Sequence, residues 1–238
     1  MSYTEDSMEK LMEGTKVVPS QEERKTLLEL KDVCFSYDGL VALRHLNLEM
    51  FAGETVVLQG PNGCGKSTLL RLVNGLIFPE VGSYLFRGKE ITEKALKDKR
   101  FCKEFHQKLG FVFQNSDTQL FTGSVEEEIA FGPRQMGLSE EEVTGRVQDL
   151  SSLMGLDSLL TRAPYQLSGG EKKKVAIACI LSMNPEVLVF DEPLAGLDKK
   201  SQDWLTAFLK ELQKTGKRCC FPPTTTIWRS FSGPALLP

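Results

Sequence analysis

The stretch Gly60-Pro61-Asn62-Gly63-Cys64-Gly65-Lys66-Ser67 decides the fold, because it joins a predicted strand to a predicted helix. A glycine, four residues and then Gly-Lys-Ser is the pattern of a phosphate-binding loop. Glycines allow backbone geometries in which successive N–H groups point inward at phosphate, and the helix N-terminus adds partial positive charge. The alternative, a glycine-rich turn that binds nothing, is disfavoured because the run has the strand and helix that the pattern requires.

Each residue of this loop has an expected role in holding a nucleotide. Lys66 is expected to reach the β- and γ-phosphates, and Ser67 is expected to bind Mg²⁺. The nucleotide-binding run is expected to extend from Gly60 to Thr68.

Outward from the loop, apolar patterns of strand type alternate with patterns of helix type. Strands are predicted at 27–33, 54–59, 109–113 and 187–190, and helices at 66–76, 139–162, 171–183 and 201–214. This alternation predicts an α/β domain with a largely parallel sheet. Polar residues 1–26 predict a flexible arm.

Composition limits the class of protein. The net charge is −3, so nothing indicates a general nucleic-acid binder. The longest strongly apolar run, Val175 to Met183, is far shorter than the roughly 18 residues of a membrane span, so any membrane role is expected to be peripheral. Six cysteines without paired metal-ligand spacing, and an N-terminus unlike a secretory signal, indicate a reducing cytoplasm.

Two acids follow the apolar strand at 187–190. The stretch Val187-Leu188-Val189-Phe190-Asp191-Glu192 resembles a Walker B segment, in which Asp191 holds Mg²⁺ and Glu192 polarises the attacking water. Solvated acids at a strand end are the alternative, and the two interpretations are about even for this stretch alone. The phosphate-binding loop upstream favours the catalytic one.

The stretch Leu167-Ser168-Gly169-Gly170-Glu171 resembles the signature motif of ATP-binding-cassette (ABC) ATPases. Without this resemblance, the residue types indicate only a helix capped by Ser168, with free backbone N–H groups at its start. The resemblance implies that these residues close over an ATP held by a second subunit, in a homodimer or heterodimer. It also implies an ABC-type ATPase domain over 27–218, with an antiparallel β subdomain and a helical subdomain at about 115–170.

Three further positions match motifs of this family. Gln114 follows an apolar run, as the Q-loop glutamine does, which implies contact with Mg²⁺ and with a membrane partner. Tyr37 lies where the family places an aromatic that stacks on adenine, although a core tyrosine is the alternative. Asp198 corresponds to the D-loop acid, which crosses the dimer interface.

A narrower likeness is to the ATPases of cobalt/nickel and energy-coupling-factor (ECF) vitamin importers. It rests on Gln114–Phe121 and Val125–Pro133, a region that docks onto a transmembrane subunit in those proteins. Leu120 and Phe121 are expected to supply the apolar anchor, unless they are core residues. The implied function is a peripheral ATPase at the cytoplasmic face of the membrane. A soluble ABC ATPase and a copy that binds ATP with little hydrolysis are the alternatives.

The C-terminal part departs from the family, which has one more strand and a switch histidine about thirty residues after Walker B. The chain has only His45 and His106, both upstream, and residues 219–238 hold four of the eleven prolines and a single charge. These features predict that the last central strand and the following helix are missing or altered, with 219–238 not folded natively. Permitted codons for Cys219–Phe231, read in a shifted frame, encode a strand followed by Thr-His-Asp, which suggests a frameshift near Lys217.

Overall fold

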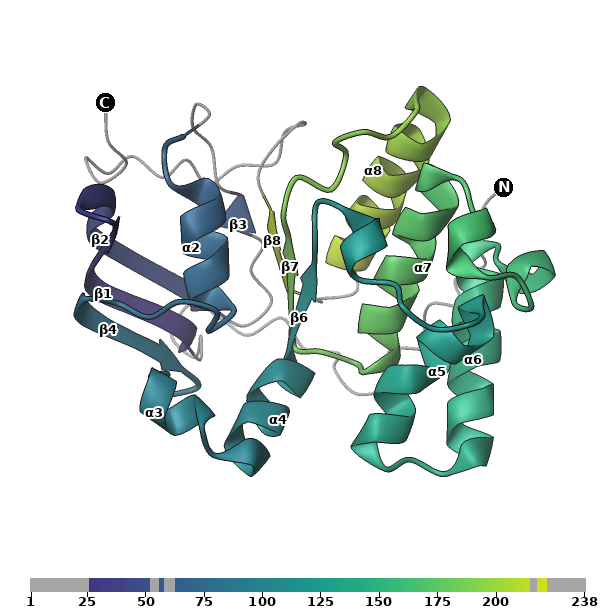
Figure 1. Cartoon of the computed structure of the whole chain (residues 1–238), viewed down its shortest axis with the longest axis horizontal. Helices are drawn as coiled ribbons and strands as arrows, with labels where there is room; N and C mark the ends of the chain where they lie inside the picture. The colour runs from purple at the N-terminus through teal and green to yellow at the C-terminus, as the bar shows by residue number, and fades with distance from the viewer. Residues whose placement is uncertain (1–25, 52–55, 58–62, 215–217, 222–238) are drawn as a thin grey trace.

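A computed structural model of the chain describes residues 26–51, 56–57, 63–214 and 218–221, which form two sheets and a group of helices (Figure 1). One sheet is antiparallel, with the order β2-β1-β4-β5, and the other is parallel, with the order β3-β8-β7-β6. The strands are β1 (Thr26–Tyr37), β2 (Leu40–Phe51), β3 (Val56–Val57), β4 (Val81–Phe86), β5 (Lys89–Glu90), β6 (Leu109–Val112), β7 (Val187–Phe190) and β8 (Arg218–Phe221).

Helices pack beside the parallel strands, and α5, α6 and α7 lie on the side away from the antiparallel sheet (Figure 1). The α-helices are α2 (Lys66–Val73), α3 (Glu93–Leu96), α4 (Lys99–Lys108), α5 (Val125–Met136), α6 (Glu140–Met154), α7 (Gly169–Ser182) and α8 (Lys199–Lys214). Short 3-10 helices are η2 (Ser116–Thr118), η3 (Asp157–Leu159) and η4 (Pro164–Gln166). No described helix has the length and apolar character needed to cross a bilayer. The expected parallel core, antiparallel sheet and helical part are confirmed.

Strand β7 joins two hydrophobic cores formed by the described residues, and all four of its residues are buried. Val187 and Val189 pack in the core beneath the antiparallel sheet, together with α2. Leu188 and Phe190 pack in the other core, among α5 to α8. Successive side chains of a strand point to opposite faces, so a strand covered on both faces reads as a continuous apolar run.

Local sequence signals set the ends of α6. The Ser139 hydroxyl accepts a hydrogen bond from the Glu142 N–H (3.3 Å), and the Glu142 carboxylate accepts one from the Ser139 N–H (3.0 Å). This reciprocal capping box satisfies two free donors of the helix start. Gly155 ends the helix with a φ of +65°, a left-handed conformation that glycine adopts at little cost. The predicted helix at 139–162 therefore ends earlier than expected.

The last central strand was predicted to be missing or altered, and the first of these alternatives is wrong, because its backbone is present as β8. β8 lies between β3 and β7 in the parallel sheet, with Leu188 opposite Cys219 and Val56 opposite Cys220. The described strand ends at Phe221, and Pro222 and Pro223 come after this residue in the sequence. Residues 222–238, and with them the predicted loss of the following helix, lie outside the described residues. So do residues 1–25 of the arm predicted at 1–26, whereas Thr26 is the first residue of β1.

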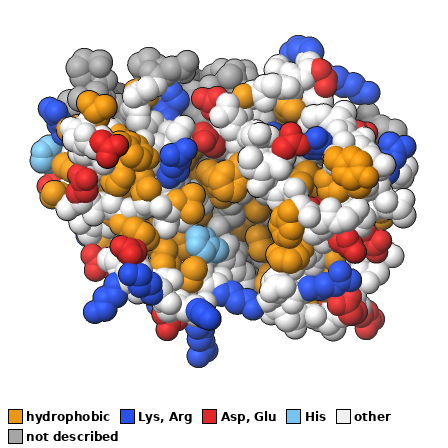
Figure 2. Space-filling view, in the orientation of Figure 1, with side chains coloured by type: hydrophobic (Ala, Val, Ile, Leu, Met, Phe, Trp, Pro, Cys, Tyr) orange, Lys and Arg blue, Asp and Glu red, His pale blue; other side chains and the backbone are white. Residues whose placement is uncertain are grey.

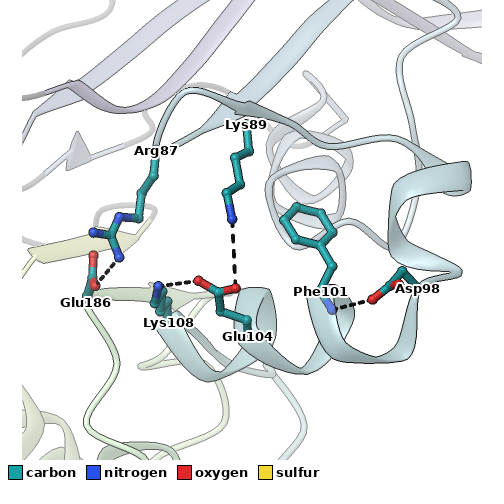
Figure 3. A network of polar contacts seen from close by, with 7 residues as sticks. All are labelled: Arg87, Lys89, Asp98, Phe101, Glu104, Lys108 and Glu186. Atoms are coloured by element: carbon teal, nitrogen blue, oxygen red, sulfur yellow. Dashed lines mark hydrogen bonds and ion pairs between the residues drawn. The ribbon is translucent and has the colours of Figure 1, made fainter.

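A polar network links the antiparallel sheet, α4 and the start of β7 (Figure 3). Arg87 donates a hydrogen bond to Glu186 (2.9 Å), and Lys108 donates one to Glu104 (2.7 Å). The Lys89 ammonium lies 3.9 Å from Glu104. The network borders a cavity of about 230 Å³ whose remaining lining residues are Phe86, Phe101 and Phe105. Each of these cations faces a carboxylate, so the network cross-links the antiparallel sheet to α4 and to the start of β7. Figure 2 shows charges of both signs intermixed along the lower edge of this face.

Candidate active site

Three predicted site residues meet where β6 and β7 end. Val112 of β6 lies opposite Phe190 of β7, and the Asp191 N–H donates to the Val112 carbonyl (3.1 Å). This register brings the residues after both strands together. The Gln114 side-chain amide donates a hydrogen bond to the Glu192 carboxylate (Nε2 to Oε2, 3.0 Å). Residues 78 positions apart in the sequence are therefore in direct contact.

The phosphate-binding loop enters α2 through glycines in left-handed conformations. Gly63 has a φ of +82° and Gly65 a φ of +91°, values that residues with a Cβ rarely adopt. Gly65 occupies the N-cap position of α2 and has no side chain to bond the first N–H groups of the helix. Those N–H groups make this helix start suited to an anion. Gly60, Pro61 and Asn62 lie outside the described residues.

The residues at the start of α2 differ in burial. Cys64 and Thr68 are buried, whereas Ser67 is exposed. The Lys66 ammonium lies 3.8 Å from the Cys64 sulfur. The described part of the loop therefore presents Ser67 to solvent while Cys64 points into the protein.

Ser67 and Asp191 form an oxygen pair suited to a hard cation. Ser67 Oγ lies 3.5 Å from Asp191 Oδ1, close enough for both oxygens to coordinate one Mg²⁺ at about 2.1 Å. Burial raises the pKa of Asp191, the neighbouring Glu192 raises it further, and Ser67 opposes the shift. A bound cation would favour the ionised carboxylate.

No group of three or more His, Cys, Asp and Glu side chains among the described residues could hold a metal by itself. The Ser67 and Asp191 oxygens nevertheless fit Mg²⁺, which commonly takes one or two protein oxygens together with substrate phosphates.

Glu192 holds an unusual backbone conformation. Its φ is +42°, in the left-handed region that disfavours residues with a Cβ. Strain of this kind costs of the order of 1–3 kcal/mol and clusters at functional sites. The carboxylate itself is held by the hydrogen bond from Gln114.

The signature residues begin α7 as a capping box. Ser168 Oγ accepts from the Glu171 N–H (3.4 Å), and the Glu171 carboxylate accepts from the Ser168 N–H (2.8 Å) and hydroxyl (2.7 Å). The hydrogen bonds from Ser168 lower the pKa of Glu171. The predicted cap is thus confirmed, and Leu167 is buried in the helical core.

The two signature glycines have different surroundings. A Cβ placed on Gly169 would meet nothing within 4 Å. A Cβ on Gly170 would lie 2.2 Å from the Ser201 hydroxyl and 3.9 Å from the Asp198 carboxylate. Gly169 therefore faces open space, whereas Gly170 is required for close packing within the chain.

Asp198 caps α8 from the loop after β7. Its carboxylate accepts hydrogen bonds from the Ser201 N–H (2.9 Å) and hydroxyl (2.9 Å), and these bonds lower its pKa. Asp198, the predicted D-loop acid, thus also stabilises the start of α8, a role that was not predicted.

The apolar side chains predicted to make contacts with nucleotide or partner divide between surface and core. Tyr37 is 39% exposed at the end of β1, where it packs edge-on against Phe35, so it is not a core tyrosine. Phe121 is 69% exposed and packs edge-on against Phe131, with ring centroids 5.0 Å apart. Leu120 packs against the helical core. The alternative of a core residue thus holds for Leu120 only.

One residue near the site was not predicted. Lys173 is 2% exposed, and its ammonium donates to the main-chain carbonyls of Phe113 (2.9 Å) and Gln114 (2.8 Å). Burial lowers its pKa to about 8, although Asp191 opposes the shift. Lys173 shares a buried helix face with Gly170 and Ile177, and this i, i+3, i+7 spacing was the available signal.

Comparisons with known proteins agree with this geometry. The ABC transporter family matches residues 43–195. The nickel import ATP-binding protein LarO of Lactiplantibacillus plantarum is 48% identical over 191 residues, 80% of this chain and 79% of that protein. The energy-coupling factor transporter ATP-binding protein EcfA of Methanothermobacter thermautotrophicus is 45% identical over 80% of this chain and 60% of that protein.

A solved structure has the same fold. It is cbiO1 from Clostridium perfringens, described as part of the ABC transporter complex cbiONQ. Its TM-score is 0.74 at 35% identity, covering 84% of this chain and 79% of that chain. The chain therefore belongs to the ABC transporter family and is related to its ATP-binding proteins.

Proposed function

We propose that the chain is the ATP-hydrolysing subunit of a membrane importer for nickel, cobalt or a vitamin. The observation that carries the proposal is the contact between Gln114 and Glu192, 3.0 Å apart, beside the pair of Ser67 and Asp191. It supports a site with a water-orienting carboxylate and an Mg²⁺-binding pair at the end of a phosphate-binding loop. Similarity to LarO and EcfA supports the class of transported substrate.

Each residue has a defined task in hydrolysis. Lys66 and the N–H groups at the start of α2 bind the β- and γ-phosphates, and Tyr37 stacks on the adenine. Ser67 and Asp191, with Gln114, would hold Mg²⁺, which neutralises charge on the phosphate oxygens when bound. Glu192 orients and polarises the attacking water, and Gln114 holds that carboxylate in place.

The signature acts on the nucleotide of a second subunit. Gly169 faces open space beside the N–H groups at the start of α7, so a phosphate of a partner's ATP can approach there. Asp198, at the start of α8, contacts the partner subunit across the same interface. ATP binding closes the dimer and hydrolysis reopens it. A homodimer and a heterodimer both fit these features.

The pair of Phe121 and Phe131 is the proposed contact with a transmembrane subunit. Both rings are exposed: Phe121 lies in the segment before α5, close in sequence to Gln114, and Phe131 lies on α5. Exposed aromatic rings are common in protein interfaces. The protein would thus lie peripherally at the cytoplasmic face of the membrane, with the Q-loop segment next to its partner.

A second candidate is a copy that binds ATP but hydrolyses it slowly. It is favoured by the absence of any histidine after residue 106 in the sequence. His45 bonds Asp32 (2.8 Å), and His106 packs against Phe105, so both histidines have other contacts. Sequencing the coding DNA around Lys217 tests the proposed frameshift, which fails if the shifted frame does not encode Thr-His-Asp.

ATP turnover and capture of a membrane subunit test the proposal together. The full chain should hydrolyse ATP in the presence of Mg²⁺, and Glu192→Gln should lower kcat by about 10²–10⁴-fold with ATP binding retained. Co-expression with the products of neighbouring genes should recover an integral membrane protein with it. Phe121→Ser should lose that protein. ATP binding without any turnover would favour the second candidate, and no ATP binding would refute both.

A further inference from the structure

Lys173 on α7 holds the main chain at the end of β6. Its ammonium bonds the carbonyl oxygens of Phe113 (2.9 Å) and Gln114 (2.8 Å), and its side chain is almost completely buried. A buried ammonium is stable only when its donors are bonded, so these two contacts restrict where the Phe113–Gln114 backbone can lie.

Further contacts join the same segment to the same helix. Lys172 forms an ion pair with Asp117 (2.6 Å). The Gln119 side chain accepts from the Phe113 N–H (3.3 Å) and donates to the Ala176 carbonyl (3.3 Å). Residues 113–119 are thus attached to α7 at several points. Lys173 is the contact that reaches Gln114 itself.

This attachment continues to the proposed water-orienting carboxylate. Gln114 is bonded to Lys173 through its main chain and to Glu192 through its side chain. A displacement of the Gln114 backbone would therefore remove its amide from Glu192. Helix α7 begins at Gly169 with Ser168 as its N-cap, so the helix that starts in the signature also positions the chain's own site.

We propose that Lys173 is a positioning residue, which holds Gln114 against Glu192 and thereby couples the signature helix to hydrolysis at the chain's own site. The proposal rests on the proposed function for its catalytic consequence only. Lys174 provides a matched control, because it lies on the same helix but bonds the Met154 carbonyl (3.0 Å) and lies over the Trp204 ring (4.6 Å).

Two readouts on the full chain test the proposal. Lys173→Met keeps an unbranched side chain of similar length and removes the donors. Hydrogen exchange of a peptide covering residues 109–121 should become about tenfold faster in Lys173→Met and stay within twofold of the parent in Lys174→Met. In steady-state hydrolysis, kcat should fall about tenfold in Lys173→Met, while the KM for ATP stays within twofold. This split is expected when an interaction matters mainly in the transition state.

The outcomes separate the inference from the proposed function. Unchanged exchange at 109–121 in folded Lys173→Met would overturn the inference, as would unchanged kcat per folded molecule. If the parent hydrolyses no ATP, the exchange result alone decides whether Lys173 positions Gln114, and the failure belongs to the proposed function. Should Lys173→Met not fold, Lys173→Ala is measured in the same way.

Discussion

The tight packing of Gly170 leads to a prediction about the signature that needs no nucleotide. Replacing Gly170 with alanine puts a Cβ 2.2 Å from the Ser201 hydroxyl and 3.1 Å from the Ser201 Cβ. Ordinary carbon contacts begin near ~3.5 Å, so Ser201 must turn away or the helices must separate. Turning Ser201 breaks its 2.9 Å bond to Asp198.

The magnitude follows from these two effects. Loss of the hydroxyl bond to Asp198 costs about 1 kcal/mol, and overpacking costs about 1–3 kcal/mol. The better helix propensity of alanine returns up to about 1 kcal/mol. Gly170→Ala should therefore lower the free energy of unfolding by about 1–3 kcal/mol, with a fall in Tm of about 2–4 °C per kcal/mol.

Urea denaturation followed by circular dichroism measures the effect. Gly169→Ala is the matched control, because nothing lies within 4 Å of its Cβ position, and it should change the free energy of unfolding by less than about 0.5 kcal/mol. Ser201→Ala removes the atom in closest contact, so its combination with Gly170→Ala should cost less than the sum of the two. Equal stability of the two glycine variants, or strict additivity, would refute the argument.

Three further predictions follow from the site. Alkylation of Cys64 should abolish ATP binding, because the thiol is buried within the phosphate-binding loop. ATP should slow the alkylation, which mass spectrometry can follow. Unchanged ATP affinity after complete modification of Cys64 would contradict the placement of this residue in the loop. Ser67→Ala should raise the Mg²⁺ concentration needed for half-maximal ATP binding by about tenfold, measured by calorimetry, and an unchanged value would exclude Ser67 as a ligand. The Glu171 carboxylate has a lowered pKa, so its stabilisation is present above the ordinary glutamate pKa of about 4.3 and is lost as the pH falls through the lowered pKa. Glu171→Gln should therefore show a smaller fall in Tm below about pH 4.3 than the parent, and an equal fall would argue against the capping box as its origin.

Part of the fold and of the site was predictable because local patterns and tertiary structure agree. The apolar run at 187–190 is buried on both faces, and the acids after it lie at the expected edge. The cap at Ser168 follows from residue types three apart. The long strands β1 and β2 were harder to define because register shifts interrupt their pairing and with it the alternation of side chains.

The two clearest failures have separate physical causes. The last central strand was predicted to be missing or altered because the prolines of residues 219–238 disfavour a central strand, but β8 has four residues and its last one, Phe221, precedes Pro222. Lys173 was not predicted as a site residue, because lysine is rarely buried without a partner. Its partners are main-chain carbonyls, which sequence cannot reveal, on a segment 59 and 60 positions away.

The most direct test of the central claim is calorimetric titration of ATP with Mg²⁺ into the full chain. The proposed site predicts saturable binding of one nucleotide per chain, which Lys66→Ala abolishes while leaving the urea midpoint unchanged. Absence of binding in the folded parent chain, or binding that survives Lys66→Ala unchanged, would contradict the assignment of the phosphate-binding loop.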